Sequence, residues 1–176
     1  DAVIVATGST PVTPNMSGVD RKEVVNAHDV LSGKAKTGKN VVVVGGGSVG
    51  CETAEYLATQ GKTVTVVEML EDVMMDSGAA VKALMLLRLA QANVNIMRKS
   101  KVIQIKDNCV LVKTENGNEC VINMDTVVIA VGVKPCMTLS DKLKGARIPH
   151  VTIGDCVKPR KIYEAIQEGF AAGYNI

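Results

Sequence analysis

A glycine-rich stretch of this 176-residue chain has the spacing of a loop that binds a diphosphate. Gly45, Gly47 and Gly50 stand in the pattern GxGxxG, directly after the apolar run Val41–Val44. The first glycine allows a tight turn, the second lets a diphosphate approach the backbone, and the third lets a following helix lie close to the strand. The N–H groups and the positive end of that helix would hold the anion.

An acidic residue stands where the ribose of a bound dinucleotide is expected. Glu68 follows the β-branched run Thr63–Val67, about twenty residues after the loop, and an acid there accepts hydrogen bonds from the ribose hydroxyls. An ordinary solvated acid at a strand end is the alternative. No Arg or Lys lies near it to pair with a 2′-phosphate, and Glu71 and Asp72 would repel one. The sequence therefore predicts a site for NADH rather than NADPH.

The elements around these residues alternate between strand and helix. Short β-branched runs and segments with apolar residues at helical spacing follow one another, which is typical of the mononucleotide-binding half of a doubly wound α/β fold. Ser77 is expected to cap the second helix. The five expected elements are Val41–Val44, Ser48–Gln60, Thr63–Val67, Ser77–Ala92 and Val94–Met97.

The rest of the chain predicts a β-meander and a few isolated elements. Three strand-like segments separated by turn residues indicate the meander: Lys101–Ile105, Cys109–Thr114 and Glu119–Asn123. Thr7–Gly18 is expected to be a loop. The other expected elements are strands at Ala2–Ala6, Thr126–Ala130 and Val151–Ile153 and helices at Asn26–Leu31 and Ile162–Tyr174.

Two stretches of the chain repeat one pattern. Asp1–Pro11 reads DAVIVATGSTP and Asp125–Pro135 reads DTVVIAVGVKP, with Asp, Val, Ala, Gly and Pro at the same offsets. Each is typical of a buried strand that runs into a glycine turn. The second stretch closes the predicted dinucleotide-binding domain. The first is expected to close a related domain that begins before Asp1, so we expect the chain to be a fragment.

The composition excludes several other functions. The basic residues are scattered and the formal net charge is +2, so the chain has no basic surface patch of the kind that binds a nucleic acid.

The five cysteines are odd in number and lack CxxC or CxxxxC spacing, so we expect free thiols, with no redox-active disulfide, metal site or catalytic group. Cys51 is expected to be a packing residue. No signal peptide or membrane span is apparent, so we expect a cytoplasmic protein.

The stretch VVVVGGGSVGCETAEYLATQGKTVTVVE resembles the NAD(P)H-binding domain of the pyridine nucleotide-disulfide oxidoreductase superfamily, whose flavoproteins carry two dinucleotide-binding domains. Within it, GGGSVGCETAEYLATQG is similar to the group of 2,4-dienoyl-CoA reductase, enoate reductase and NADH oxidase. Those enzymes join an N-terminal barrel with FMN and an iron–sulfur cluster to FAD- and NAD-binding domains. The resemblance implies NAD(H) and FAD as cofactors, with FMN and a 4Fe-4S cluster in a region that precedes this chain.

The resemblance divides the chain into three parts. Residues 37–135 would form the NAD(H)-binding domain, a Rossmann-like α/β domain inserted into a FAD-binding domain. Residues 1–36 and 136–176 would be pieces of that FAD-binding domain. The motif Thr152–Asp155 looks like the second flavin motif, whose aspartate typically binds the ribityl chain. Glu52 matches an acid that lies toward the nicotinamide, and an ordinary surface glutamate is the alternative.

The resemblance also implies two sets of binding residues. The set for the nicotinamide dinucleotide is Gly45, Gly47, Ser48, Val49, Gly50, Glu52, Glu68, Met69, Val102, Ala130, Val131 and Gly132. The set for FAD in the full-length enzyme is Thr7, Gly8, Gly154 and Asp155.

Three functions remain open from the sequence. In the first, NADH binds at the glycine loop and passes hydride to FAD in the full-length enzyme, an NADH oxidase or an enoyl- or dienoyl-CoA reductase. The second is a structural module that holds ADP, as in trimethylamine dehydrogenase-like proteins. The third is a standalone dehydrogenase, which needs an acid, base or metal that the sequence does not offer. The glycine loop together with Glu68 favours the first. The expected partners are the rest of the polypeptide and a second copy paired through exposed strand edges.

We expect this chain not to retain FAD, because it lacks the first glycine motif that binds the FAD diphosphate in the superfamily. The purified protein should therefore show no flavin absorbance. A stoichiometric flavin spectrum would contradict this expectation.

Overall fold

The computed structural model describes residues 2–176 and divides the chain into two compact units. Unit 1 holds the two ends of the chain, up to Val12 and from Val133, and unit 2 holds Thr13–Gly132. Asp1, with which the repeated stretch begins, lies outside the described residues. The domain boundaries expected after residues 36 and 135 stay a prediction. The glycine loop and Glu68 both lie in unit 2.

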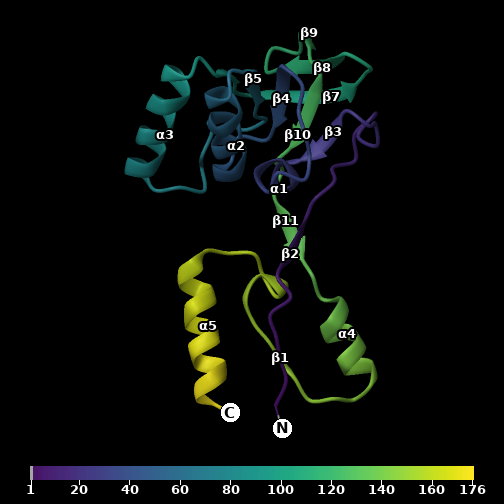
Figure 1. Ribbon diagram of the computed structural model, residues 1–176, viewed down its shortest axis with the longest axis vertical. Coiled ribbons are helices and arrows are strands. Elements are labelled where there is room, and N and C mark those ends of the chain that lie inside the picture. Colours follow the sequence, from purple (N-terminus) through teal and green to yellow (C-terminus); the bar gives the residue numbers. More distant parts are fainter. Residues whose placement is uncertain (1) are drawn as a thin grey trace. The chain divides into compact units, whose positions relative to one another are not determined.

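A five-stranded parallel sheet forms the centre of unit 2 (Figure 1). Its strands lie in the order β3-β10-β4-β5-β6, and each neighbouring pair is parallel. Parallel neighbours need crossover connections, which α2 supplies between β4 and β5 and α3 between β5 and β6. The bounds are β3 Val24–Asn26, α1 Ala27–Leu31, β4 Asn40–Val44, α2 Ser48–Thr59, β5 Thr63–Val67, α3 Ala79–Gln91, β6 Asn95–Met97 and β10 Thr126–Ile129.

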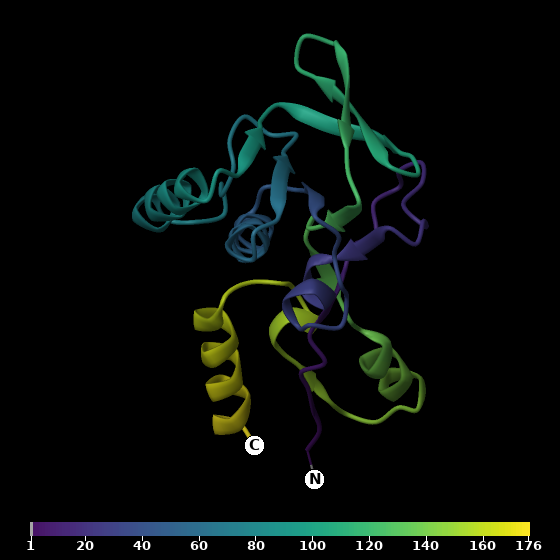
Figure 2. The ribbon, with the colours of Figure 1, turned by 45° about the horizontal axis from the view of Figure 1, so that its top comes forward.

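Alternating valines explain why both faces of this sheet are covered. In β4, Val41 and Val43 belong to one apolar core, whereas Val42 and Val44 belong to another. Successive side chains of a strand point to opposite faces, so a continuous apolar run serves both cores. The first core contains residues of the helices and the second contains residues of the meander. Figure 2 shows α2 and α3 on one face of the sheet and the meander on the other.

The meander is an antiparallel sheet of three strands in the order β7-β8-β9. One extra residue between Val102 and Gln104 forms a β-bulge in β7. The predicted α/β fold, with a parallel central sheet and a three-stranded meander, is therefore confirmed. The bounds are β7 Ser100–Ile105, β8 Cys109–Thr114 and β9 Glu119–Asn123.

Unit 1 is built from shorter elements. β1 pairs in parallel with β12, and β2 pairs antiparallel with β11. Among the described residues of this unit, the buried apolar side chains are Val5 and Cys156, so its core is small. The bounds are β1 Ile4–Val5, β2 Ser9–Pro11, β11 Val133–Pro135, α4 Thr138–Gly145, β12 Val151–Thr152, the 3-10 turn η1 Gly154–Cys156 and α5 Ile162–Tyr174.

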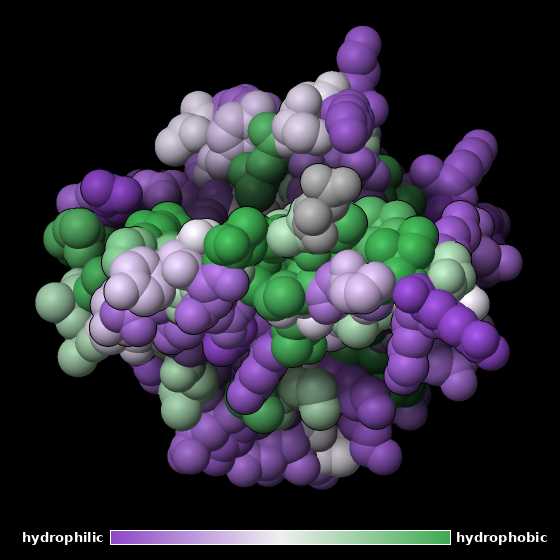
Figure 3. All heavy atoms as spheres, turned by 90° about the horizontal axis from the view of Figure 1, so that it is seen from below, coloured by the Kyte–Doolittle hydropathy of each residue, from purple (hydrophilic) through white to green (hydrophobic). Residues whose placement is uncertain are grey.

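The surface of unit 1 carries many apolar side chains. None of the residues of α5 is buried, and Ile162, Ile166 and Phe170 follow one another at intervals of one helical turn. The ring of Phe170, which is 74% exposed, stacks on that of Tyr174. Apolar side chains gather in a band across the face seen in Figure 3.

Several local features of the structure differ from the expectations. α3 begins at Ala79 with Gly78 as its N-cap, because the hydroxyl of Ser77 bonds that of Ser48 instead of capping the helix. The expected loop after Thr7 contains β2, because β11 supplies a distant pairing partner. The short polar helix α4 was not expected at all.

Within residues 2–176, no helix combines the length and the apolar character needed to cross a bilayer.

We expect Leu57→Ala to lower the free energy of unfolding by about 2–4 kcal/mol, because the deletion leaves a cavity in a core. Leu57 lies on α2 and is 1% exposed. The matched control is Leu87→Ala on α3, where the side chain is 55% exposed and the loss should stay below about 0.5 kcal/mol. Urea unfolding followed by far-UV circular dichroism measures both. Equal losses would contradict the assignment of this core.

Candidate functional site

The carboxyl ends of β4, β5 and β10 meet at one edge of the unit 2 sheet. The crossovers from β4 run toward β5 and β6, whereas β10 and β3 lie on the other side of β4. This edge is therefore the topological switch point, where open α/β sheets bind ligands. The segments that follow the three strands are Gly45–Gly47, Glu68–Met69 and Ala130–Gly132. The fold thus brings together three groups of residues that the sequence predicted to bind a dinucleotide.

Gly45 and Gly50 are required by close backbone packing. Gly45 has a φ of +103°, and a Cβ there would lie 2.5 Å from the carbonyl oxygen of Ala130. A Cβ on Gly50 would lie 2.0 Å from the carbonyl oxygen of Gly45. Because neither position accepts a side chain, α2 begins directly against the turn that ends β4.

Gly47 differs from these two glycines because it has room. It is the N-cap of α2, with extended backbone angles of φ −67° and ψ −177°. The nearest atoms to a Cβ there would be the carboxylate oxygens of Asp76, at 3.9 Å. The fold itself therefore tolerates a larger residue at Gly47. A glycine at this helix N-terminus leaves space for a diphosphate to reach the backbone N–H groups.

The carboxylate of Glu68 fastens the glycine loop to the end of β5. The residue is 6% exposed, its Oε2 accepts the N–H of Gly46 at 2.5 Å, and its Oε1 accepts the N–H of Leu70 at 2.8 Å. A carboxylate has about four acceptor sites, so both oxygens retain capacity for a ribose diol. Gly46 was missed because the pattern GxGxxG leaves its position variable. A Cβ there would lie 2.5 Å from Val73.

Cys51 packs beneath the loop. Its side chain is buried, and its Sγ donates to the carbonyl oxygen of Gly46. Burial, reinforced by the negative charges of Asp76 and Glu68, raises the pKa of the thiol to about 12. A helix N-terminus lowers the pKa of a thiol, and here burial outweighs that effect. The interpretation of Cys51 as a packing residue is confirmed.

The other predicted dinucleotide-binding residues differ in exposure. Gly132 has a φ of +100° and continues the turn after β10. Val102 is buried in the core between the sheet and the meander. Contacts of all these residues with a ligand stay a prediction. The exposed members are Val49, Glu52, Met69, Val131 and Gly132.

The fold places two basic side chains against Asp72 that are remote from it in the sequence. The Nζ of Lys82 lies 2.7 Å from one carboxylate oxygen of Asp72, and the Nε of Arg98 lies 2.6 Å from the other. These two contacts hold the pKa of Asp72 below its ordinary range. The expectation that no Arg or Lys stands near Glu68 to pair with a 2′-phosphate considered sequence neighbours alone, whereas in space Lys82 and Arg98 reach Asp72. Both cations are paired with Asp72.

In unit 1, the predicted flavin-binding motifs converge. Thr7 Oγ1 donates to the carbonyl oxygen of Cys136 at 2.7 Å, and the N–H of Cys136 donates to the carbonyl oxygen of Gly8 at 3.0 Å. The hydroxyl of Ser9 lies 3.5 Å from the carboxylate of Asp155, although 146 residues separate them in the sequence. The pairing of β1 with β12 and of β2 with β11 explains this convergence.

The turn at Gly154 is held by α5. Gly154 has a φ of +70°, and its N–H donates to Glu168 Oε2 at 2.6 Å. Glu168 also pairs with Arg160, whose backbone N–H donates to Asp155. The bond from Gly154, followed by that from Arg160, holds the pKa of Glu168 below its ordinary value. These contacts fix the backbone next to Asp155.

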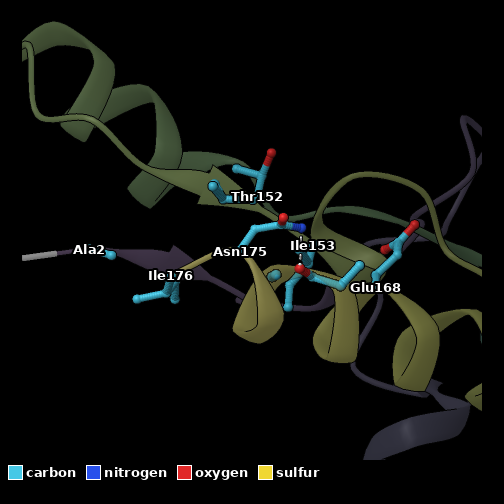
Figure 4. A pocket seen from close by; sticks show the side chains of 9 residues that line it. Ala2, Thr152, Ile153, Glu168, Asn175 and Ile176 are labelled. Atoms are coloured by element: carbon cyan, nitrogen blue, oxygen red, sulfur yellow. Dashed lines mark hydrogen bonds between the residues drawn. The ribbon is translucent and has the colours of Figure 1, made fainter.

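A hollow of about 670 Å³ lies between α5 and the β1–β12 pair (Figure 4). Thr152 of β12 and Ile153 after it line one side, and Glu168 of α5 and its C-cap Asn175 line the other. The amide of Asn175 donates to the carbonyl oxygen of Ala171. The hollow separates this face of α5 from the strand pair.

Within residues 2–176, no group of three or more His, Cys, Asp or Glu side chains is arranged to hold a metal ion. The five cysteines in that range are free thiols.

Comparison with known proteins identifies long relatives of this chain. It is 37% identical over 185 residues to an NADH oxidase from Thermoanaerobacter brockii, covering 100% of this chain and 28% of the relative. It is 37% identical over 179 residues to a cinnamate reductase from Clostridium sporogenes, covering 100% of this chain and 26% of the relative. A solved structure of 2-naphthoyl-CoA reductase in complex with 2-naphthoyl-CoA matches with a TM-score of 0.95 at 36% identity, covering 100% of this chain and 27% of that one.

These relatives are oxidoreductases by name, and the chain spans little more than a quarter of their length. The family model described as pyridine nucleotide-disulphide oxidoreductase matches residues 1–169. Since that match runs through both units, the chain belongs to the pyridine nucleotide-disulphide oxidoreductase family.

Proposed function

We propose that this chain is the NADH-binding module of a flavin-dependent oxidoreductase, and that it delivers hydride from NADH to FAD in the full-length enzyme. The observation that carries the proposal is the geometry at the carboxyl edge of the unit 2 sheet. There, the open glycine position at the N-terminus of α2 stands beside the carboxylate of Glu68. A diphosphate and a ribose diol of one dinucleotide are the groups that such a pair binds.

In this proposal the chain binds and orients the dinucleotide, and the nicotinamide and flavin supply the redox chemistry. The N–H groups of the loop and of the first turn of α2 bind the diphosphate. Glu68 accepts hydrogen bonds from the ribose hydroxyls. Thr7 and Gly8, together with Gly154 and Asp155, would hold FAD with the remainder of the flavin half. FMN and a 4Fe-4S cluster are proposed only for a separate barrel domain in the region that precedes this chain.

The partner that we propose for unit 1 is the rest of a longer polypeptide. The exposed apolar side chains of α5 and the hollow beside it support a covering segment there. A second copy of the chain is the alternative expected from the sequence.

We propose the cytoplasm as the compartment, because free thiols persist in a reducing environment. The names of the relatives support an unsaturated acyl compound or oxygen as the terminal acceptor.

A structural ADP-binding module is the second candidate. The glycine loop and Glu68 both act on the ADP half of a dinucleotide, so the same geometry serves ADP. Calorimetric titration with NADH and with ADP separates the two functions. Tighter binding of NADH supports the redox module, whereas binding of ADP at least as tight as that of NADH supports the structural one.

We expect Gly47→Ala to weaken NADH binding by about tenfold or more, a cost of about 1.4 kcal/mol. The added methyl group would stand where the diphosphate approaches the loop. The free energy of unfolding should fall by no more than about 1 kcal/mol, the cost of alanine in place of glycine at an N-cap, because the backbone is extended and a Cβ has room. Isothermal titration calorimetry and urea unfolding measure the two effects.

The matched control is Gly78→Ala, at the N-cap of α3, where a Cβ meets nothing within 4 Å. This variant should bind NADH as the wild type does. Wild-type affinity in Gly47→Ala would show that the diphosphate does not lie at this glycine.

We expect the wild type to prefer NADH over NADPH, and Asp72→Asn to raise the affinity for NADPH relative to NADH by about tenfold. The substitution releases Lys82 and Arg98 for charge-assisted hydrogen bonds to a 2′-phosphate. Asp107→Asn on the β7–β8 turn, which removes one of the two acidic partners of Arg21, is the control for a lost Asp–Arg pair. Calorimetry with both dinucleotides gives the ratio. A ratio that Asp72→Asn leaves unchanged would refute this account of specificity.

A further inference from the structure

The chain between β5 and α3 returns to the glycine loop and lies against it. We call residues 73–78 the strap. The N–H of Met74 donates to the carbonyl oxygen of Gly46 at 2.7 Å. The hydroxyl of Ser77 lies 2.6 Å from that of Ser48, the first residue of α2. The strap thus contacts the loop before and after Gly47.

Between these two contacts, the carboxylate of Asp76 lies at the N-terminus of α2. The N–H of Ser48 donates to the carboxylate, at 3.1 Å from Oδ1 and 3.3 Å from Oδ2. Both oxygens lie 3.9 Å from the position of a Cβ on Gly47. An anion of the chain therefore stands at the one glycine of the loop that has room for a diphosphate.

We propose that Asp76 is an internal competitor for the diphosphate of the dinucleotide and so determines the affinity of the site. This inference rests on the proposed function. The partial positive charge and the N–H groups of a helix N-terminus favour one bound anion, here the carboxylate. A diphosphate carries more charge and more acceptor oxygens, so it displaces the carboxylate. Each binding event then includes the loss of the bond between Asp76 and Ser48.

The strap can release Asp76 without opening a core. Val73 and Met74 are 0% and 1% exposed, and they anchor its first half. Met74 has a φ of +53°, a left-handed conformation that a bulky residue adopts only when its surroundings hold it. In contrast, Met75 is 65% exposed and Asp76 is exposed. A rotamer change of the Asp76 side chain is enough to move the carboxylate into solvent, while the anchor stays buried and the hydroxyl of Ser77 stays on that of Ser48.

The competition acts on ligands that carry phosphate groups. ADP and NADH both require the N-terminus of α2, so both must displace Asp76. Adenosine has no phosphate and leaves the carboxylate in place. Removal of the charge of Asp76 therefore affects the binding of ADP and NADH but not that of adenosine.

The variant Asp76→Asn tests the inference. Its amide oxygen can still accept the N–H of Ser48 but carries no charge, so ADP and NADH should bind about threefold to tenfold more tightly. Titration calorimetry measures both ligands, and amide chemical shifts follow adenosine, whose binding should not change. Asp141→Asn, an exposed acid in the first turn of α4, removes the same charge elsewhere and should leave every affinity unchanged.

Two outcomes would overturn the inference and leave the proposed function intact. If the wild type binds NADH and Asp76→Asn binds it equally well, Asp76 does not compete. If the variant binds NADH more weakly, Asp76 positions the loop for the ligand. Failure of both proteins to bind NADH or ADP would overturn the proposed function and this inference together.

A ligand-free measurement checks the contact itself. In Asp76→Ala the amide of Ser48 loses its acceptor, so its hydrogen exchange should accelerate severalfold relative to the wild type. Unchanged exchange would show that the carboxylate does not occupy the helix N-terminus in solution, and would contradict the inference without any ligand present.

Discussion

The close packing of α2 against the turn at Gly45 fixes the glycine loop and the N-terminus of α2, around which the candidate site is built. A Cβ on Gly50 would lie 2.0 Å from the carbonyl oxygen of Gly45, so the helix reaches the sheet edge because both residues lack side chains. The first N–H groups of the helix, which have no partner within it, are thereby placed at that edge. The same packing places the backbone of Gly46 within reach of Glu68 and buries Cys51 beneath the loop.

The parts of the fold that could be predicted are those with local signals. The valines of β4 and the β-branched residues of β5 indicate strands by themselves, and the glycine spacing indicates the turn and the helix that follows. Glu68 could be placed because its distance from the loop along the chain is characteristic. The meander followed from turn residues between short apolar runs.

The parts that could not be predicted depend on contacts between distant residues. Ser77 has the residue type of an N-cap, but the hydroxyl of Ser48 supplies a partner that the local sequence does not reveal. Lys82 and Arg98 reach Asp72 only because α3 and the end of β6 lie beside the end of β5. Glycine and proline residues stand in and beside β2 and β11, and each segment forms a strand only by pairing with the other. Asp76 belongs to this group too, since its position at α2 follows from the return of the strap.

The pairing of β2 with β11 also bears on how such a chain is assembled from parts. Pro11 stands opposite Val133, and the chain passes from unit 1 to unit 2 after Val12 and returns after Gly132. Unit 2 is therefore inserted in the chain between two neighbouring antiparallel strands. A tight turn in its place would convert β2 and β11 into an ordinary hairpin. In genetic terms, unit 2 occupies the place of a hairpin loop, so recombination can replace its coding segment while β2 and β11 stay paired.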